Sequence, residues 1–240
     1  MQGLQIDCAL MGPWSPPSGG LHLDGLLAWS AVQMAMQRDD TSEQTYADLI
    51  VDLPLDRHEF DDGQWVWKAS IFHAVGWMGQ SRQYMTQKTP AERMLEGVAD
   101  GWITEKGGST IDLQRGYAKN GQLFVTKEHA QGLRAWCVGD IDAVSEFLSH
   151  VKAVGVKTRM GMGTLRPYDD GSLFRVTPCD DAQTLWMRRN TPVQLIEGSV
   201  AKIGRWNAPY WGEKSYCWTP AEFRIPADVV PAPAVCTEAA

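Results

Sequence analysis

The chain has 240 residues, of which 44% are hydrophobic and 21% are charged, as is typical of a globular protein with one large domain or two small ones. No apolar run approaches the length that spans a bilayer, and the N-terminal residues lack the basic start and apolar stretch of a signal peptide. We therefore expect a cytoplasmic protein with no membrane partner. The five cysteines lie far apart without a CxxC pair, so we expect no metal site, no disulfide framework and no cofactor.

The net charge of −7 is distributed unevenly along the chain. Residues 1–64 carry eleven Asp and Glu against two Arg, whereas residues 65–240 carry twenty Lys and Arg against eighteen acidic residues. Residues 152–205 hold nine basic side chains and five acidic ones. The nine are Lys152, Lys157, Arg159, Arg166, Arg175, Arg188, Arg189, Lys202 and Arg205. Such a basic stretch can serve an anionic ligand, and the alternative is ordinary solvated surface charge.

The first forty residues predict a strand, a loop and a helix. Apolar residues alternate with polar ones from Leu4 to Leu10, as in a half-buried strand. The segment MGPWSPPSGG is rich in Gly and Pro and ends this strand. Apolar residues then recur at helical spacing from Leu23 to Met34, which predicts an amphipathic helix over about residues 22–37.

The middle of the chain predicts a short helix, a hairpin, a strand and a second long helix. The short helix lies in KTPAERMLEGV, and the hairpin lies over residues 109–126 with Asn-Gly as its turn. The strand is LRAWCVG, and Asp140 directly after it can cap a helix that carries apolar residues on one face up to Val151. Strand candidates and a Trp-rich segment follow.

Without the insertion between them, these elements follow a β-α-β-β-α-β order. This order is typical of an α+β, ferredoxin-like (RRM-like) fold, in which two helices cover one face of an antiparallel sheet. We expect one such domain over residues 1–225, with an insertion at about residues 40–108 and additional β or irregular structure toward the C-terminus. The Pro- and Ala-rich tail over residues 226–240 is expected to be poorly ordered.

The run GVKTRMGMGTL, from Gly155 to Leu165, combines three glycines with two cations. It lacks the Lys-Ser/Thr pair of a phosphate-binding Walker loop, and it follows a helix where a dinucleotide fingerprint would follow a strand. Two interpretations remain. The glycines can let the backbone pass close to phosphates with Lys157 and Arg159 beside it, or Gly155 can take a left-handed conformation as a helix C-cap before a turn.

Two segments together resemble the RAMP superfamily of CRISPR-associated proteins. They are LHLDGLLAWSAV, residues 21–32, and the stretch GDIDAVSEFLSHVKAVGVKTRMGMGTLRPY, residues 139–168, because the glycine-rich loop of that superfamily follows the second ferredoxin-like helix. More narrowly, the His-Leu-Asp start of the first helix, PL at Pro54, KAS at residues 68–70 and Gly-Asp before the second helix resemble the Cas-five-like subunit of type IV class 1 CRISPR effectors.

This resemblance implies a RAMP fold and a subunit that is not an enzyme. Such a subunit holds the 5′ handle of a CRISPR RNA, lies beside the large and backbone subunits of a ribonucleoprotein, and contributes to the engagement of target double-stranded DNA near its protospacer-adjacent motif. The RNA-binding residues expected on this basis are Gly155, Lys157, Thr158, Arg159, Gly161, Gly163, Arg166, His22, Arg82 and Lys88. Candidate stacking platforms for bases are Trp14, Trp186, Trp206 and Trp211, and the alternative for each is packing in the core or at a subunit interface.

The alternative function is a metal-free endoribonuclease that processes repeat RNA, as in some members of that superfamily. This reaction needs a base near the 2′-OH, a general acid and a cation, and His22 is the best candidate base. The competing interpretation is that His22 helps cap the helix beside Asp24. A third hypothesis is a protein-interaction subunit that uses its acidic N-terminal face and touches no RNA. The segment of about residues 79–108 is a candidate RNA-contacting finger that orders on assembly.

Paired carboxylates occur at residues 39–40, 61–62 and 169–170. Such pairs can bind a metal ion, but adjacent acids in turn-like segments are usually only solvated.

Overall fold

The structure is a computed structural model. It describes residues 1–37, 52–87, 91–101, 121–208, 210 and 213–227. The chain divides into two compact units, of which unit 1 comprises residues 1–80 and 128–240 and unit 2 comprises residues 81–127.

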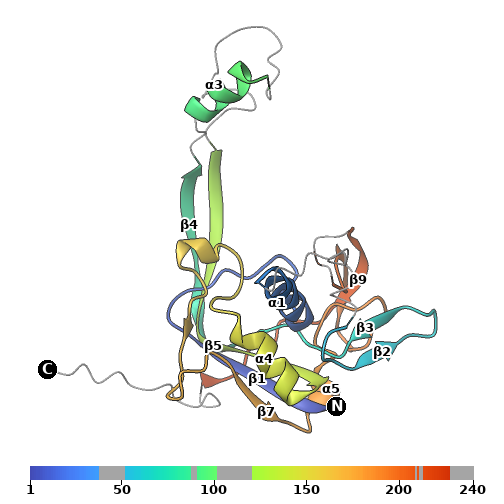
Figure 1. The fold of residues 1–240 in the computed structure, drawn as a ribbon. Helices are drawn as coiled ribbons and strands as arrows, with labels where there is room; N and C mark the ends of the chain where they lie inside the picture. Colours follow the sequence, from blue (N-terminus) through green and yellow to red (C-terminus); the bar gives the residue numbers. More distant parts are fainter. Residues whose placement is uncertain (38–51, 88–90, 102–120, 209, 211–212, 228–240) are drawn as a thin grey trace, which may run out of the picture. The chain divides into compact units, whose positions relative to one another are not determined.

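An antiparallel sheet is the centre of unit 1 (Figure 1). Its strands are β1 (Gln2–Leu10), β4 (His73–Gln87), β5 (Gly121–Gly139), β6 (Leu165–Arg166) and β7 (Arg175–Pro178). They follow the order β4-β5-β1-β6, with β7 also paired to β1. Strand β1 is antiparallel to β5, β6 and β7.

The last strand of the expected order is therefore divided into two short pieces on β1. The end of β1 at Ala9 and Leu10 pairs with β6, and residues 4–7 pair with β7. The α+β class is confirmed, and the strand order is compatible with a ferredoxin-like arrangement.

Helices α1 (Leu23–Gln37) and α4 (Ile141–Ser149) pack against each other on one face of this sheet (Figure 1). Both were predicted from apolar spacing. The predicted cap of α4 is confirmed, because the Asp140 carboxylate accepts hydrogen bonds from the backbone N–H groups of Asp142 and Ala143.

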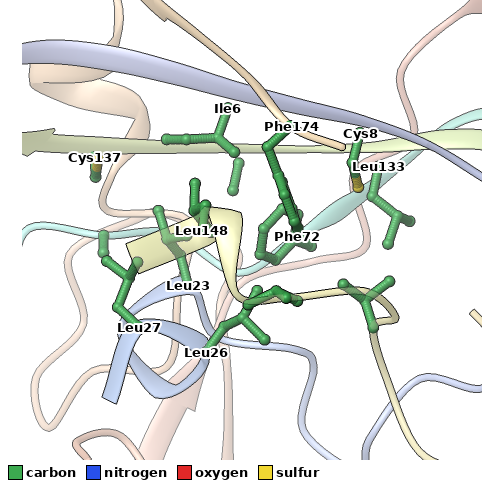
Figure 2. Packing of buried hydrophobic residues seen from close by; sticks show 14 of the residues in the cluster. Ile6, Cys8, Leu23, Leu26, Leu27, Phe72, Leu133, Cys137, Leu148 and Phe174 are labelled. Atoms are coloured by element: carbon green, nitrogen blue, oxygen red, sulfur yellow. The ribbon is translucent and has the colours of Figure 1, made fainter. Parts of the chain in front are cut away.

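The main core lies between these two helices and the sheet. Figure 2 shows leucines of α1 and Leu148 of α4 facing Ile6, Cys8 and Cys137 of the strands. Alternate residues of β5, namely Leu133, Ala135 and Cys137, belong to this core. The period of two in β1 and β5 thus directs one set of side chains toward the helices.

The opposite face of the sheet is covered by residues after β7. Trp136 packs there with Val75 of β4 and with Ala182 of the short helix α5 (Ala182–Leu185). The same face holds a buried ion pair in which Arg134 Nε lies 2.6 Å from Asp7 Oδ1. Because both faces are covered, most residues of β1 and of the unit 1 part of β5 are buried.

Two small hairpins complete unit 1. Strands β2 (Arg57–Glu59) and β3 (Trp65–Trp67) form one, and β8 (Val200–Gly204) and β9 (Ser215–Thr219) form the other. The second hairpin supplies the β structure expected toward the C-terminus.

Unit 2 contains the distal parts of β4 and β5 and the predicted short helix α3 (Ala91–Ala99). The exposed rings of Tyr84 and Phe124 pack together with their centroids 4.3 Å apart. The first arm of the hairpin predicted over residues 109–126 lies outside the described residues, and β5 pairs with β4 in the part of the chain that is described. The tail beyond residue 227 also lies outside it.

None of the helices within the described ranges has the length and apolar character that crossing a bilayer requires.

The buried imidazole of His73 makes the stability of unit 1 dependent on pH. Burial, with Arg188 adding to it, lowers the pKa of His73 from 6.5 to about 4. The unfolded chain therefore binds a proton below pH 6.5 that the folded chain excludes, so stability falls as the pH falls. At pH 5 this single group removes about 2 kcal/mol of the stability present at pH 7.5.

Replacement of His73 by Phe keeps a ring beside Trp136 and Phe223 but removes the titration. Urea unfolding at pH 7.5 and pH 5 is expected to show a loss of stability that is smaller in His73→Phe than in the native chain by about 2 kcal/mol. Equal losses in the two proteins would contradict the assignment.

Candidate nucleic-acid interface

The glycine-rich run after α4 is docked on the turn that precedes α1. The Val156 N–H donates to the Ser15 carbonyl at 2.8 Å, and the Gly163 N–H donates to the Pro13 carbonyl at 3.0 Å. A Cβ atom on Gly155 would lie 2.5 Å from the Ser15 carbonyl oxygen. Close approach of two backbones therefore explains a glycine at residue 155.

The same run contains several left-handed residues. Gly155, Gly161 and Gly163 have φ angles of +86°, +77° and +67°. The left-handed conformation expected for Gly155 is confirmed, but its expected role as the helix C-cap is wrong. His150, with a right-handed φ of −81°, caps α4, because the helix ends before the loop turns toward residues 11–15.

Lys157 is the one non-glycine residue with a positive φ, +63°, in the described part of the chain. It precedes the 3-10 turn Thr158–Met160, which Gly161 closes. A non-glycine residue keeps this conformation only where its surroundings impose it, and such residues cluster at functional sites. The side chains of Lys157 and Arg159 are both exposed, so the loop presents two cations to solvent.

A cavity of about 630 Å³ lies beside this loop. Three segments line it: residues 17–29 around the start of α1, residues 153–158 of the loop, and residues 190–214 around β8. The cations Lys202, Arg205 and Lys214 are among the lining residues. None of the described residues that line it is acidic. The cavity therefore favours an anionic ligand.

His22 forms part of the cavity wall although only 4% of the residue is exposed. Its ring stacks on Tyr210 with the centroids 4.4 Å apart. Neither ring nitrogen makes a hydrogen bond of good geometry with the described residues, although the Gly19 backbone lies within reach of the ring. Burial, with the nearby Arg189 charge second, holds the pKa of His22 well below its usual range. The imidazole is therefore uncharged at neutral pH.

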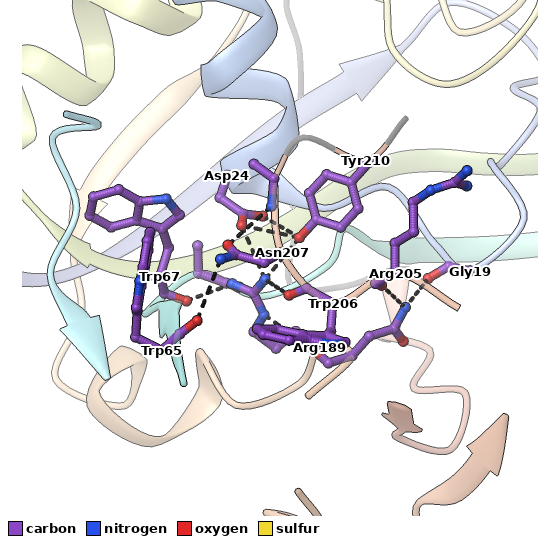
Figure 3. A network of polar contacts seen from close by, with 12 residues as sticks. Gly19, Asp24, Trp65, Trp67, Arg189, Arg205, Trp206, Asn207 and Tyr210 are labelled. Atoms are coloured by element: carbon purple, nitrogen blue, oxygen red, sulfur yellow. Dashed lines mark hydrogen bonds and ion pairs between the residues drawn. The ribbon is translucent and has the colours of Figure 1, made fainter. Parts of the chain in front are cut away.

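Arg189 is the centre of a buried polar network behind this wall (Figure 3). Its guanidinium pairs with Asp24 at 3.0 Å, and both side chains are fully buried. The other acceptors of its NH1 and NH2 groups are the carbonyls of Trp67, Ala69 and Trp206 and the Tyr210 hydroxyl. The network connects the first turn of α1 with the edge of β3 and the segment after β8.

One count made from the sequence changes at this network. Arg189 belongs to the counted basic stretch, but it is neutralised by Asp24 inside the protein and cannot meet a ligand phosphate. The carboxylate of Asp24 accepts from Arg189 and from the Tyr210 hydroxyl. His22 directly precedes α1 and caps it through its backbone, because its carbonyl accepts from the Leu26 N–H.

The structure brings together part of the predicted RNA-binding set. Those that line the cavity are Gly155, Thr158 and His22. Those that lie in the same loop outside the lining are Lys157, Arg159, Gly161 and Gly163. Arg166 is exposed on β6 and lines a second cavity of about 530 Å³. Arg82 is an exposed residue of unit 2, and Lys88 lies outside the described residues.

Most candidate stacking tryptophans prove to be packing residues. Trp14 and Trp186 are buried in hydrophobic clusters, which confirms the alternative interpretation for both. Trp206 is partly buried, and its indole N–H donates to the Ser215 hydroxyl at 2.8 Å. Trp211 lies outside the described residues.

The short motifs that carry the family resemblance contact one another. The Asp140 N–H donates to the Pro54 carbonyl at 3.1 Å, and the Val138 N–H donates to the Lys68 carbonyl at 2.9 Å. The Ser70 hydroxyl accepts from the Trp136 N–H at 2.8 Å. PL, KAS and Gly-Asp are thus structural partners at the end of β5.

No group of described residues has the composition of a metal site. Asp62 and Asp170 accept backbone hydrogen bonds within exposed turns, which agrees with solvated carboxylates in turn-like segments. Cys8 and Cys137 are free and buried, and burial raises the pKa of both thiols. Residues 39–40 lie outside the described residues.

Sequence reasoning missed two kinds of lining residue. Trp29 is 44% exposed and lines the cavity from α1. The sequence held a signal for this, because helical spacing places His22, Gly25, Leu26 and Trp29 on one face. Lys214 also lines the cavity, but it lies outside the counted basic stretch.

Comparison with known proteins places the chain in a family. Residues 2–222 match the family described as Csf3, CRISPR type IV associated protein Csf3. No curated protein matches the chain. Because the match covers most of the sequence, the chain belongs to the Csf3 family, and it is a type IV CRISPR-associated protein.

The glycines of the loop are expected to differ in their tolerance of alanine. No atom lies within 4 Å of a Cβ added to Gly161. Gly161→Ala is therefore expected to lower the free energy of unfolding by about 1–2 kcal/mol, which is the cost of a left-handed conformation for a residue with a Cβ. Gly155→Ala and Gly163→Ala add overlap with the backbone carbonyls of Ser15 and Val154, which is expected to cost about 1–3 kcal/mol more. Urea unfolding measures the difference, and equal losses at the three positions would contradict the docking argument.

Proposed function

We propose that this Csf3-family protein is the CRISPR RNA-binding subunit of a type IV class 1 effector ribonucleoprotein and that it holds the 5′ handle of the RNA. The observation that carries the proposal is the cavity beside the glycine-rich loop, which is lined by Lys202, Arg205 and Lys214 and by no described acidic residue. Phosphate contacts from such cations supply most of the affinity of nucleic-acid binding.

A RAMP fold of the Cas-five-like kind is part of the same proposal. The strand order and the glycine-rich loop after α4 support it, because this is the loop position on which the resemblance depends. As partners we propose the large and backbone subunits of the effector and, through the assembled complex, target double-stranded DNA near its protospacer-adjacent motif. Crosslinking of the assembled complex distinguishes this role from that of a subunit that touches no RNA.

The exposed cations of the loop provide the direct test of RNA binding. Lys157→Ala combined with Arg159→Ala is expected to weaken binding to RNA that carries the 5′ handle. It is also expected to lower the slope of log K against log salt by about 0.7 for each phosphate contact removed. Fluorescence anisotropy at several salt concentrations measures both quantities.

Arg57→Ala is the control, because Arg57 is an exposed cation on β2 whose guanidinium stacks over Trp65 and Trp67 at 4.5 and 4.6 Å, away from the cavity lining. It is expected to leave the salt slope unchanged. An unchanged affinity and slope in the Lys157/Arg159 variant would overturn the proposed function.

We also propose that the chain is not the endoribonuclease that processes the repeat. His22, the best candidate base, is stacked on Tyr210, and no carboxylate among the described lining residues stands beside it as a general acid. Labelled repeat RNA incubated with the pure protein in chelator is therefore expected to stay intact. Cleavage that disappears in His22→Ala would establish the nuclease instead.

A further inference from the structure

The cavity has features that a site for phosphate alone does not require. Helix α1 contributes Gly25, Leu26 and Trp29 to one wall, next to His22, which directly precedes the helix. The helical spacing of these residues brings a large indole into a cavity that cations also line. Trp29 is 44% exposed, whereas Trp14, Trp67, Trp136 and Trp186 are buried. An exposed indole beside cations is a stacking surface for a base.

The buried end of the same wall is fixed in place. A Cβ atom on Gly25 would lie 2.7 Å from the Tyr210 ring, so a glycine there lets this ring lie close to α1. The Tyr210 hydroxyl is held by Asp24, with oxygen distances of 3.0 and 3.1 Å. His22 stacks on that ring, so its imidazole has a defined position at the cavity.

His22 is an enclosed polar group at this position. Only 4% of the residue is exposed, and neither ring nitrogen makes a hydrogen bond of good geometry with the described residues, although the Gly19 backbone lies within reach of the ring. An uncharged imidazole that directs its N–H to a backbone carbonyl keeps one acceptor nitrogen. That acceptor matches a donor on the edge of a base better than it matches a phosphate, which only accepts.

We propose that the cavity takes one unstacked ribonucleotide of the bound RNA, with the base on the Trp29 indole, an edge of that base at His22, and the phosphate near Lys202 and Lys214. A volume of about 630 Å³ lies within the range of small-molecule sites. The absence of acidic groups from the described lining favours a nucleotide over a basic peptide. This inference rests on the proposed function and adds to it a reading site, by which we mean a site that recognises one nucleotide of the RNA.

The test uses RNAs that carry the 5′ handle and a single abasic substitution at each position in turn. Trp29→Ala is expected to weaken binding of the intact RNA about tenfold, since stacking of one base has that order of effect. At one position, the abasic RNA is expected to bind the native protein weakly and to show no further loss with Trp29→Ala. Tyr216→Ala is the matched control, because Tyr216 is an exposed aromatic residue of β9 outside the cavity lining, and it is expected to leave every affinity unchanged.

A second substitution tests the partner of His22. His22→Phe keeps a ring that can stack on Tyr210 but removes both nitrogens. At the RNA position that Trp29→Ala identifies, the native protein is expected to bind the natural base more tightly than a base with an altered hydrogen-bonding edge. His22→Phe is expected to reduce this difference in affinity. Trp29→Leu, which keeps an apolar side chain without a π face, replaces Trp29→Ala if circular dichroism shows that the alanine variant does not fold.

The inference is overturned if Trp29→Ala and Trp29→Leu bind intact RNA as the native protein does, or if their losses are equal on every abasic RNA. Either result, together with RNA binding that still depends on Lys157 and Arg159, leaves the proposed function standing and removes only the reading site. A protein without measurable RNA binding overturns both. Binding of a partner protein that is lost in Trp29→Ala, with RNA affinity unchanged, overturns the nucleotide assignment in favour of a protein contact.

Discussion

The buried ion pair between Arg189 and Asp24 is the constraint on which the candidate site depends. A guanidinium with no exposed surface must have all its hydrogen bonds satisfied, because an unpaired buried charge is strongly destabilising. Arg189 meets this requirement with groups from α1, from β3 and from the segment after β8. Three segments that are far apart in the sequence are thereby held together, and the cavity lies where they meet the glycine-rich loop.

The glycine-rich loop separates into structural and exposed parts. Gly155 allows the loop to approach the Ser15 carbonyl, and Gly163 allows it to approach the Val154 carbonyl while its N–H donates to Pro13, so both glycines serve the docking of the loop. Lys157 and Arg159 extend to solvent from the turn between them. The close packing of the loop holds Lys157 in a left-handed conformation that an isolated lysine would rarely adopt. Rigid docking and exposed charge are compatible because different residues provide them.

The cavity combines two recognition chemistries in a single site. Lys202, Arg205 and Lys214 supply positive charge that attracts any polyanion, whereas Trp29 and the uncharged His22 offer stacking and directional hydrogen bonding. In the proposed role, charge supplies affinity that depends on salt, and stacking with hydrogen bonding supplies the discrimination between nucleotides. Membership of the Csf3 family places this arrangement in a type IV CRISPR-associated protein.

The sequence by itself determined the elements whose periodicity is local: the alternation in β1, the apolar face of α1, and the cap that Asp140 gives to α4. The short motifs at Pro54, at residues 68–70 and before α4 also carried the family resemblance, and the structure places them together around the end of β5. Only the tertiary structure decided which charges are available. Arg189 and Lys202 look alike in a count of basic residues, but one is buried against a carboxylate 165 positions away and the other lines the cavity. Burial and long-range pairing leave no periodic trace in the chain, so the site itself had to come from the fold.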